Sequence, residues 1–81
     1  MTKSEVREIV AEVFEGVAAE IRSDTDLRSL PAFDSVNVLT LIIALDERAG
    51  IKLGPEQAAS LRFFREIEEI AAKQGLVLTG D

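Results

Sequence analysis

The sequence predicts a small all-α protein, a four-helix bundle of three main helices and one short helix, with a long ordered loop between the first two. The 81-residue chain contains only five glycines and two prolines, so most of its length lacks residues that interrupt helices. Hydrophobic residues make up 47% of the chain, and in several segments they recur every three or four residues. A chain of this length can bury one core, so we expect one domain over residues 1–81.

The segment from Thr2 to about Ile21 is predicted to form the first helix. Its apolar residues fall on one stripe of a helical surface: Val6, Ile9, Val10, Val13, Phe14, Val17 and Ile21. Thr2 and Glu5 have the spacing of a capping box at its start. Gly16 weakens a helix by about 1 kcal/mol relative to alanine, and we expect the helix to continue through it.

Residues 22–33 form a connection that is longer than most links between antiparallel helices. We expect this loop to be ordered and to include a turn of helix, because three apolar residues can pin it against the bundle: Leu27, Leu30 and Phe33. Asp24 or Asp26 offers a local cap. Their spacing resembles a calcium loop, but the glycine and the terminal glutamate of such a loop are missing, so we expect no metal site.

The second helix is expected to start after Asp34-Ser35 and to end at Gly50, a natural left-handed stop. Pro55 suits the first position of a short helix that runs to Ala59. The last helix is expected to begin near Ser60 or Arg62 and to close at Gly75. Residues 76–81 form a short tail that is either frayed or lightly docked.

The second helix carries more apolar residues than one buried face needs. One stripe suffices for the core: Val38, Leu41, Ile42, Leu45 and Ala49. Val36, Leu39 and Ile43 form a second ridge beside it, on the flank that carries Asp46 and Glu47. We expect Val36 to pack against the long loop, whereas Leu39 and Ile43 are either packed there or exposed. An exposed apolar pair rimmed by carboxylates has the composition of a transient docking face.

The chain is acidic, with a formal net charge of −6. Nucleic-acid affinity depends on lysine and arginine contacts with phosphates, so we expect basic protein surfaces as partners and no nucleic acid. No stretch approaches the roughly 18 apolar residues of a membrane span. Four charged residues near the start interrupt any secretory signal: Lys3, Glu5, Arg7 and Glu8. These features predict a cytoplasmic protein without a membrane span.

The sequence contains no cysteine, histidine, tyrosine or tryptophan. A thiol nucleophile, a zinc site and a serine–histidine pair are therefore excluded. An enzyme would need Asp, Glu or Lys as its base, which is uncommon in so short a chain. We expect that the protein is not an enzyme and that any sulfur nucleophile is supplied by another molecule.

The dipeptide Asp34-Ser35 stands where the long loop ends and the second helix begins. Both residue types prefer cap positions, so Ser35 taken alone is an ordinary helix cap, with Asp34 as the alternative cap. A group attached to Ser35 would face the positive end of the helix dipole and unpaired backbone amides. A phosphate is favourable in such a place, which makes Ser35 a candidate for covalent modification.

The segment from Asp26 to Ile51 resembles the acyl carrier protein family, whose members bear phosphopantetheine. The resemblance is carried by Asp26-Leu27, Phe33-Asp34-Ser35-Val36 and Leu45-Asp46-Glu47-Arg48-Ala49-Gly50-Ile51. It extends over nearly the whole chain, because the last helix is similar to the closing helix of the family.

This resemblance implies that Ser35 is esterified by 4'-phosphopantetheine, which a magnesium-using phosphopantetheinyl transferase takes from coenzyme A. Asp34 matches the acidic residue that belongs to the recognition element of the transferase. The cofactor would supply the thiol that the chain lacks and would hold acyl or aminoacyl groups as thioesters. Further partners would be a loading ligase, a ketosynthase or an acyltransferase, and we expect a monomer.

Some residues depart from the family pattern. Phe33 replaces a glycine that often precedes Asp-Ser, and Val36 replaces the commoner leucine. Asn37 and Thr40 are neutral where carriers of fatty acid synthesis usually have acids, which makes that pathway less favoured. Phe63 stands where a small hydroxyl residue often opens the last helix, so we expect it to alter the lining of a cargo cavity.

We interpret the chain as a discrete acyl carrier protein that serves separate enzymes of a specialised biosynthetic pathway, such as polyketide or lipid synthesis. One alternative is a carrier for primary fatty acid synthesis. Another is an unmodified four-helix interaction module in which Ser35 is only a cap. A small enzyme is the weakest alternative, because Ser35 beside Asp34 has no evident general base.

Overall fold

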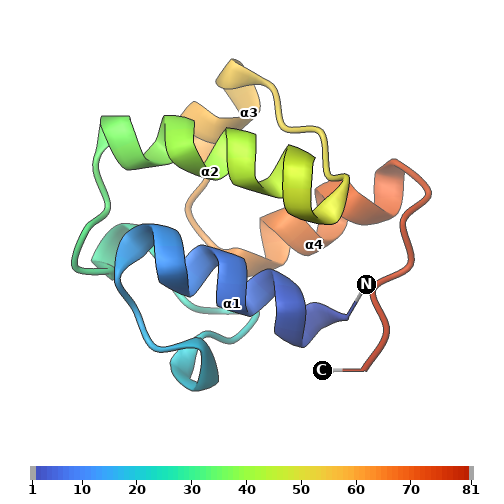
Figure 1. Ribbon diagram of the computed structural model, residues 1–81, viewed down its shortest axis with the longest axis horizontal. Helices are drawn as coiled ribbons and strands as arrows, with labels where there is room; N and C mark the ends of the chain where they lie inside the picture. The colour runs from blue at the N-terminus through green and yellow to red at the C-terminus, as the bar shows by residue number, and fades with distance from the viewer. Residues whose placement is uncertain (1, 81) are drawn as a thin grey trace.

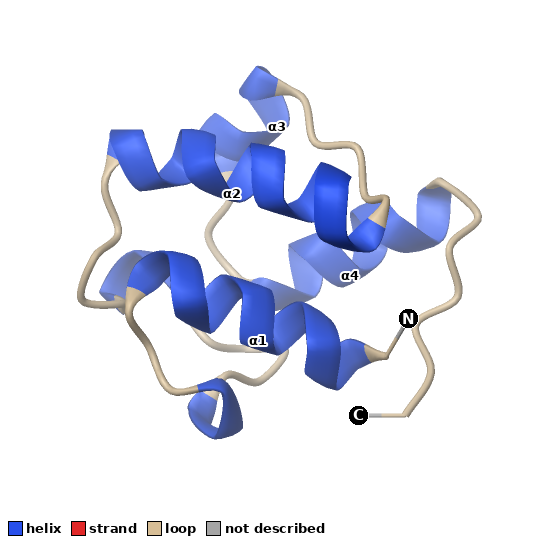
Figure 2. Ribbon diagram, in the orientation of Figure 1, coloured by secondary structure: helices blue, strands red, loops and turns tan. Residues whose placement is uncertain are grey.

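The computed structural model describes residues 2–80 and shows no strand among them. Four α-helices are present in this part of the chain: α1 (Lys3–Phe14), α2 (Ser35–Ala49), α3 (Pro55–Ser60) and α4 (Phe64–Lys73). Two single-turn 3₁₀-helices lie in the loop between α1 and α2: η1 (Ala18–Glu20) and η2 (Leu27–Ser29). The predicted all-α bundle of three main helices and one short helix is confirmed (Figure 2).

α1 and α2 pack against each other and run in opposite directions, and α4 passes behind them (Figure 1). α3 packs against α2. The first and last segments of the described chain meet on one side of the bundle, where the backbone N–H of Lys3 donates to the carbonyl oxygen of Thr79 at 3.1 Å. No helix of residues 2–80 is long and apolar enough to cross a membrane.

The helices enclose an apolar core. Its largest fully buried side chains are those of Phe14, Phe64, Leu27, Leu41, Leu45, Ile51, Ile67, Val6 and Val10. The core stripe predicted for α2 is confirmed, because Leu41 and Leu45 are fully buried while Val38, Ile42 and Ala49 pack partly against the core. This packing fixes the rotation of α2 about its axis and so decides which of its residues face solvent.

α1 ends at Phe14, so the prediction that it continues to residue 21 was wrong. Glu15 adopts a left-handed conformation with φ of 55°, and the N–H of Gly16 donates at 2.9 Å to the carbonyl five residues before it, which closes the helix. A Cβ on Gly16 would lie only 3.2 Å from Cδ2 of Leu30. Gly16 therefore lets the following loop approach closely, and the helix ends beside the glycine that was expected to lie within it.

The loop between α1 and α2 is ordered, as predicted. Leu27 is fully buried, and Leu30 and Phe33 pack partly against the core. The ring of Phe33 lies 5.1 Å from that of Phe14, centroid to centroid. Of the two candidate caps, Asp26 is the one used, since its carboxylate accepts a hydrogen bond of 2.9 Å from a backbone N–H of η2.

Backbone hydrogen bonds also tie this loop to the start of α4. They run from Leu27 N–H to Arg62 O at 2.6 Å, from Phe64 N–H to Thr25 O at 3.1 Å and from Arg65 N–H to Ser23 O at 2.9 Å. Ile21, which was assigned to the stripe of α1, is buried from within the loop, whereas Val17 is 56% exposed. The loop is thus held by α1 on one side and by α4 on the other.

The predicted boundaries of the later helices are correct at some ends only. Gly50 stops α2 in a left-handed conformation with φ of 69°, and Pro55 opens α3, as expected. α4 begins at Phe64, later than predicted, because the carboxylate of Glu66 accepts hydrogen bonds from the N–H groups of Arg62 and Phe63 at 3.0 and 2.6 Å and fixes the first turn there.

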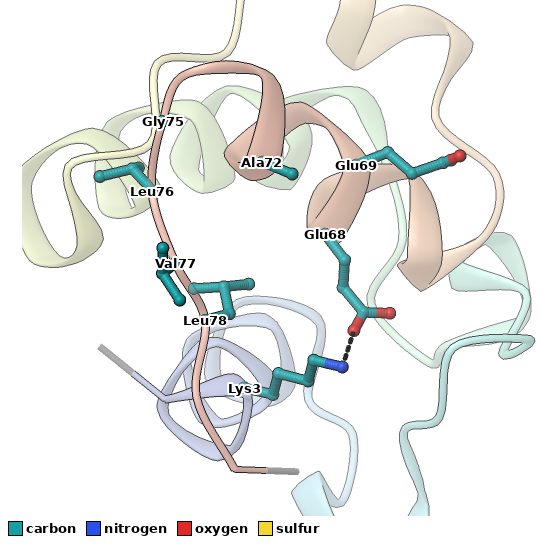
Figure 3. A pocket seen from close by; sticks show the side chains of 8 residues that line it. All are labelled: Lys3, Glu68, Glu69, Ala72, Gly75, Leu76, Val77 and Leu78. Carbon is teal, nitrogen blue, oxygen red and sulfur yellow. Dashed lines mark ion pairs between the residues drawn. The ribbon is translucent and has the colours of Figure 1, made fainter.

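The tail after α4 is docked up to the last described residues, and Asp81 lies outside them. Leu76 and Leu78 pack partly against the core, and Thr79 accepts the hydrogen bond from the start of α1. Figure 3 shows how the tail and α4 surround a shallow hollow whose edge carries an ion pair of 3.4 Å between Lys3 and Glu68. This hollow involves neither α2 nor α3.

Candidate functional site

Ser35 is the first residue of α2, and its side chain is exposed. The helix is capped by Asp34, whose Oδ1 accepts a hydrogen bond of 2.7 Å from the backbone N–H of Asn37. The interpretation of Ser35 as the cap is therefore wrong. Because Asp34 performs this role, the hydroxyl of Ser35 makes no hydrogen bond within the described residues and is open to chemistry from outside.

The first turn of α2 leaves backbone donors beside this hydroxyl. The first N–H groups of a helix have no partner within it. Asp34 satisfies the N–H of Asn37, which leaves those of Ser35 and Val36 without a protein acceptor among residues 2–80. These donors and the positive end of the helix dipole favour a negatively charged group on Ser35.

An apolar hollow of about 400 Å³ opens next to Ser35, between α2 and α3. Its lining is contributed by Phe33, Ser35, Val38, Leu39, Ile42, Pro55, Ala58 and Ala59. The α3 part of this lining was not predicted from the sequence. The paired small residues Ala58 and Ala59 beside Pro55 were a signal for it, because small side chains leave space between two packed helices.

Phe63 does not belong to this hollow, so the prediction that it alters the cavity lining is not supported. It lies just before α4, and its ring is covered by two guanidinium groups. The Cζ atoms of Arg62 and Arg65 are 5.2 and 4.6 Å from the ring centroid. Phe63 therefore belongs to the junction between the loop and α4.

The second apolar ridge of α2 faces solvent. Val36, Leu39 and Ile43 are 69%, 60% and 58% exposed. The prediction that Val36 packs against the loop was wrong, because the rotation that buries Leu41 and Leu45 turns Val36 outward. The ridge starts one residue after Ser35 and follows α2 for two turns.

Two carboxylates lie on α2 beyond this ridge, and they differ in their surroundings. Asp46 forms an ion pair with Lys52 in the loop after α2. Glu47 is exposed and forms no ion pair within the part of the chain that the structure describes. Glu47 is therefore the carboxylate more available to a basic partner.

Among residues 2–80, no group of three or more acidic side chains is placed to hold a metal ion. Asp26, one of the two residues with the spacing of a calcium loop, caps η2 through Oδ1, and its Oδ2 accepts a hydrogen bond of 3.3 Å from Nε of Arg62.

Comparison with known protein families agrees with this geometry. The model of a family described as a phosphopantetheine attachment site matches residues 4–72. Comparison with curated proteins found no match.

Proposed function

This chain belongs to the phosphopantetheine attachment-site family, and from that premise we propose that Ser35 is the residue that bears the cofactor. Members of the family bind 4'-phosphopantetheine covalently and act as carriers rather than as catalysts. The observation that carries the assignment is the exposed, uncommitted hydroxyl of Ser35 at the start of α2.

The residues around Ser35 fit the chemistry of this group. Its phosphate is anionic, and it would be attached beside the unpaired N–H groups of Ser35 and Val36. In the transfer, the hydroxyl of Ser35 loses its proton to a base of the transferase, a bond from Oγ to phosphorus forms, and the pyrophosphate bond of coenzyme A breaks as the nucleotide half leaves. Asp34, which holds the helix start, would also contribute to recognition by the transferase.

The bound group supplies the thiol that a chain without cysteine needs to hold acyl or aminoacyl groups as thioesters. The hollow between α2 and α3 lies directly beside Ser35 and is lined mainly by apolar side chains. Burial of apolar surface contributes about 25 cal/mol per Å², so an apolar cargo would be stabilised there.

The exposed ridge of α2 would be the docking face for partner enzymes. Val36, Leu39 and Ile43 offer apolar contacts, and Asp46 and Glu47 offer negative charge. The partners would be a phosphopantetheinyl transferase and a loading ligase, ketosynthase or acyltransferase.

A specialised pathway, such as polyketide or lipid synthesis, is supported by the neutral residues Asn37 and Thr40 on the first two turns of α2. The alternative is primary fatty acid synthesis. The neutral side chains reduce the negative charge that a basic partner would meet near Ser35, so partners that depend on acids at these positions would dock less well.

Measurement of intact mass tests the assignment. The protein is incubated with coenzyme A, magnesium and a phosphopantetheinyl transferase of broad specificity, beside a Ser35→Ala control. We expect the wild-type protein alone to gain the mass of one phosphopantetheine group. An unchanged wild-type mass, with a transferase that modifies a known carrier in the same buffer, would favour an unmodified interaction module that uses the α2 ridge.

A further inference from the structure

Asn37 is the residue that connects the start of α2 to the loop before it. Its side-chain amide, partly buried, donates from Nδ2 to the carbonyl oxygen of Ala32 at 2.9 Å. Its backbone N–H donates to Oδ1 of Asp34 at 2.7 Å. One residue thus bonds two points of the chain that precedes Ser35.

These bonds continue into α1. The N–H of Ala32 donates to the carbonyl oxygen of Phe14, the last residue of α1, at 3.0 Å. Ala32 is therefore held through its N–H by α1 and through its carbonyl by Asn37. The ring of Phe33 packs on that of Phe14, which supports the same connection from the core side.

These hydrogen bonds close residues 32–37 into a ring, because the side-chain amide of Asn37 bonds back to the carbonyl oxygen of Ala32. Ser35 lies within this ring. The side chain of Ser35 makes no hydrogen bond of its own among the described residues. The position of its hydroxyl therefore depends on the backbone of this ring. A small displacement of a reacting atom can reduce a rate strongly even when binding is unchanged.

We propose that Asn37 is a positioning residue for the modification of Ser35, and that its neutral amide is required because it must donate to Ala32. This inference rests on the proposed function of Ser35. An ionised aspartate has nearly the same shape but offers only acceptors, so it would face the Ala32 carbonyl oxygen without a proton between them.

The variant Asn37→Asp distinguishes an effect of charge on α2 from an effect of the hydrogen bond that Asn37 donates to Ala32. A negative charge in the first turn of a helix is favourable, so Asn37→Asp should preserve or improve the stability of α2 if charge alone matters. A more acidic α2 should also favour a basic transferase. If donation to Ala32 matters, the same change should slow the modification of Ser35. The two explanations therefore predict opposite effects.

Thr40 provides a matched control. It is exposed on the second turn of α2, and its hydroxyl donates only to the carbonyl oxygen of Val36 in the same helix, at 3.3 Å. Thr40→Asp adds the same charge to the same helix without touching the loop. Asn37→Ala removes the donor without adding charge.

The experiment measures kcat and KM for transfer from coenzyme A to each variant. For both Asn37→Asp and Asn37→Ala we expect kcat about tenfold lower, as for the loss of one hydrogen bond that positions the reacting hydroxyl. KM should be little changed in Asn37→Ala and unchanged or lower in Asn37→Asp, where the added charge favours a basic transferase. Thr40→Asp should not be slower than the wild-type protein. Rates for both Asn37 variants equal to wild type would overturn the proposal.

Hydrogen exchange distinguishes a local loosening at Ala32 from a loss of stability of the whole domain. The amide of Ala32 should lose protection in both Asn37 variants, whereas amides of α4 keep theirs. Ala71→Gly, a buried change in α4, which lines no part of the hollow beside Ser35, serves as a variant of reduced stability. If it slows transfer as much as Asn37→Ala does, stability rather than positioning explains the effect, and the inference fails. Absence of any wild-type modification would instead reject the function proposed for Ser35. Hydrogen exchange at Ala32 would still show whether Asn37 holds the ring of residues 32–37.

Discussion

The reactivity assigned to Ser35 depends on the residue before it. Serine and aspartate are both good helix caps, and in this chain they are adjacent. The structure gives the cap to Asp34, which accepts the hydrogen bond from Asn37, and leaves the Ser35 hydroxyl exposed. The proposed modification site thus lies one position after the residue that caps the helix.

This separation predicts different stabilities for neighbouring variants. Asp34→Ala loses the cap and should lower the free energy of unfolding by about 1 kcal/mol, which is about 4–8 °C in Tm for a domain of this size. Ser35→Ala changes an exposed side chain and should stay within about 0.5 kcal/mol of the wild-type protein. Thermal denaturation followed by circular dichroism measures both.

Asp34→Asn serves as the control that separates capping from charge. Asparagine caps about as well as aspartate, so this variant should keep its Tm while transfer to Ser35 slows if the transferase reads the charge. A loss of Tm in Ser35→Ala as large as that in Asp34→Ala would show that Ser35 contributes to the cap and would contradict its assignment as an uncommitted hydroxyl.

At the scale of the element, α2 presents two apolar faces that differ in exposure. Leu41 and Leu45 are fully buried in the core, whereas Leu39 and Ile43 are more than half exposed. An exposed apolar ridge on a well-packed helix is typical of a surface that binds a partner transiently. The buried face holds α2 in place, and the exposed face is available for docking.

Leucines on these two faces allow a matched comparison. Leu39→Ala should change the free energy of unfolding by less than about 0.5 kcal/mol, whereas Leu41→Ala should lower it by about 2–5 kcal/mol. Leu39→Ala and Ile43→Ala should both reduce turnover by a partner enzyme, because the docking contact is lost. Urea denaturation and steady-state kinetics measure the two properties. A large loss of stability in Leu39→Ala would show that this residue belongs to the core.

The sequence predicted those elements whose ends are decided locally. Gly50 stops α2, Pro55 opens α3, and Thr2 with Glu5 forms the capping box of α1, each through residues within a few positions. The end of α1 was missed because Glu15, a residue that rarely takes the left-handed conformation, takes it here and closes the helix before Gly16.

Two further parts of the site depend on contacts between distant segments. The hollow beside Ser35 needs α3 to pack against α2, and the exposure of Val36 follows from the rotation that the core imposes on α2. A periodic pattern gives the faces of a helix but not the direction in which each face points. The position of Ser35, by contrast, was predicted from Asp34-Ser35 and the helix that follows.

For the whole molecule, net charge sets how partners approach. The formal charge is −6, and part of the acidic surface is engaged within the chain. Four ion pairs lie among residues 2–80: Lys3–Glu68, Arg48–Glu12, Lys52–Asp46 and Arg62–Asp26. Exposed pairs contribute little to stability, but they reduce the charge that a basic partner meets locally.

Variants of Asp46 and Glu47 can show whether a partner enzyme is attracted by the total charge of the protein or by individual unpaired carboxylates. Asp46→Asn and Glu47→Gln each change the net charge by the same amount, yet of the two only Asp46 forms an ion pair among residues 2–80, with Lys52. We expect Glu47→Gln to raise the KM for a partner enzyme more than Asp46→Asn at low salt, and this difference to shrink above about 0.5 M NaCl, where the Debye length falls to a few ångströms. KM measured across a salt series tests this. Equal effects of the two variants at every salt concentration would mean that total charge steers the encounter, and that the pairing of Asp46 with Lys52 does not matter for docking.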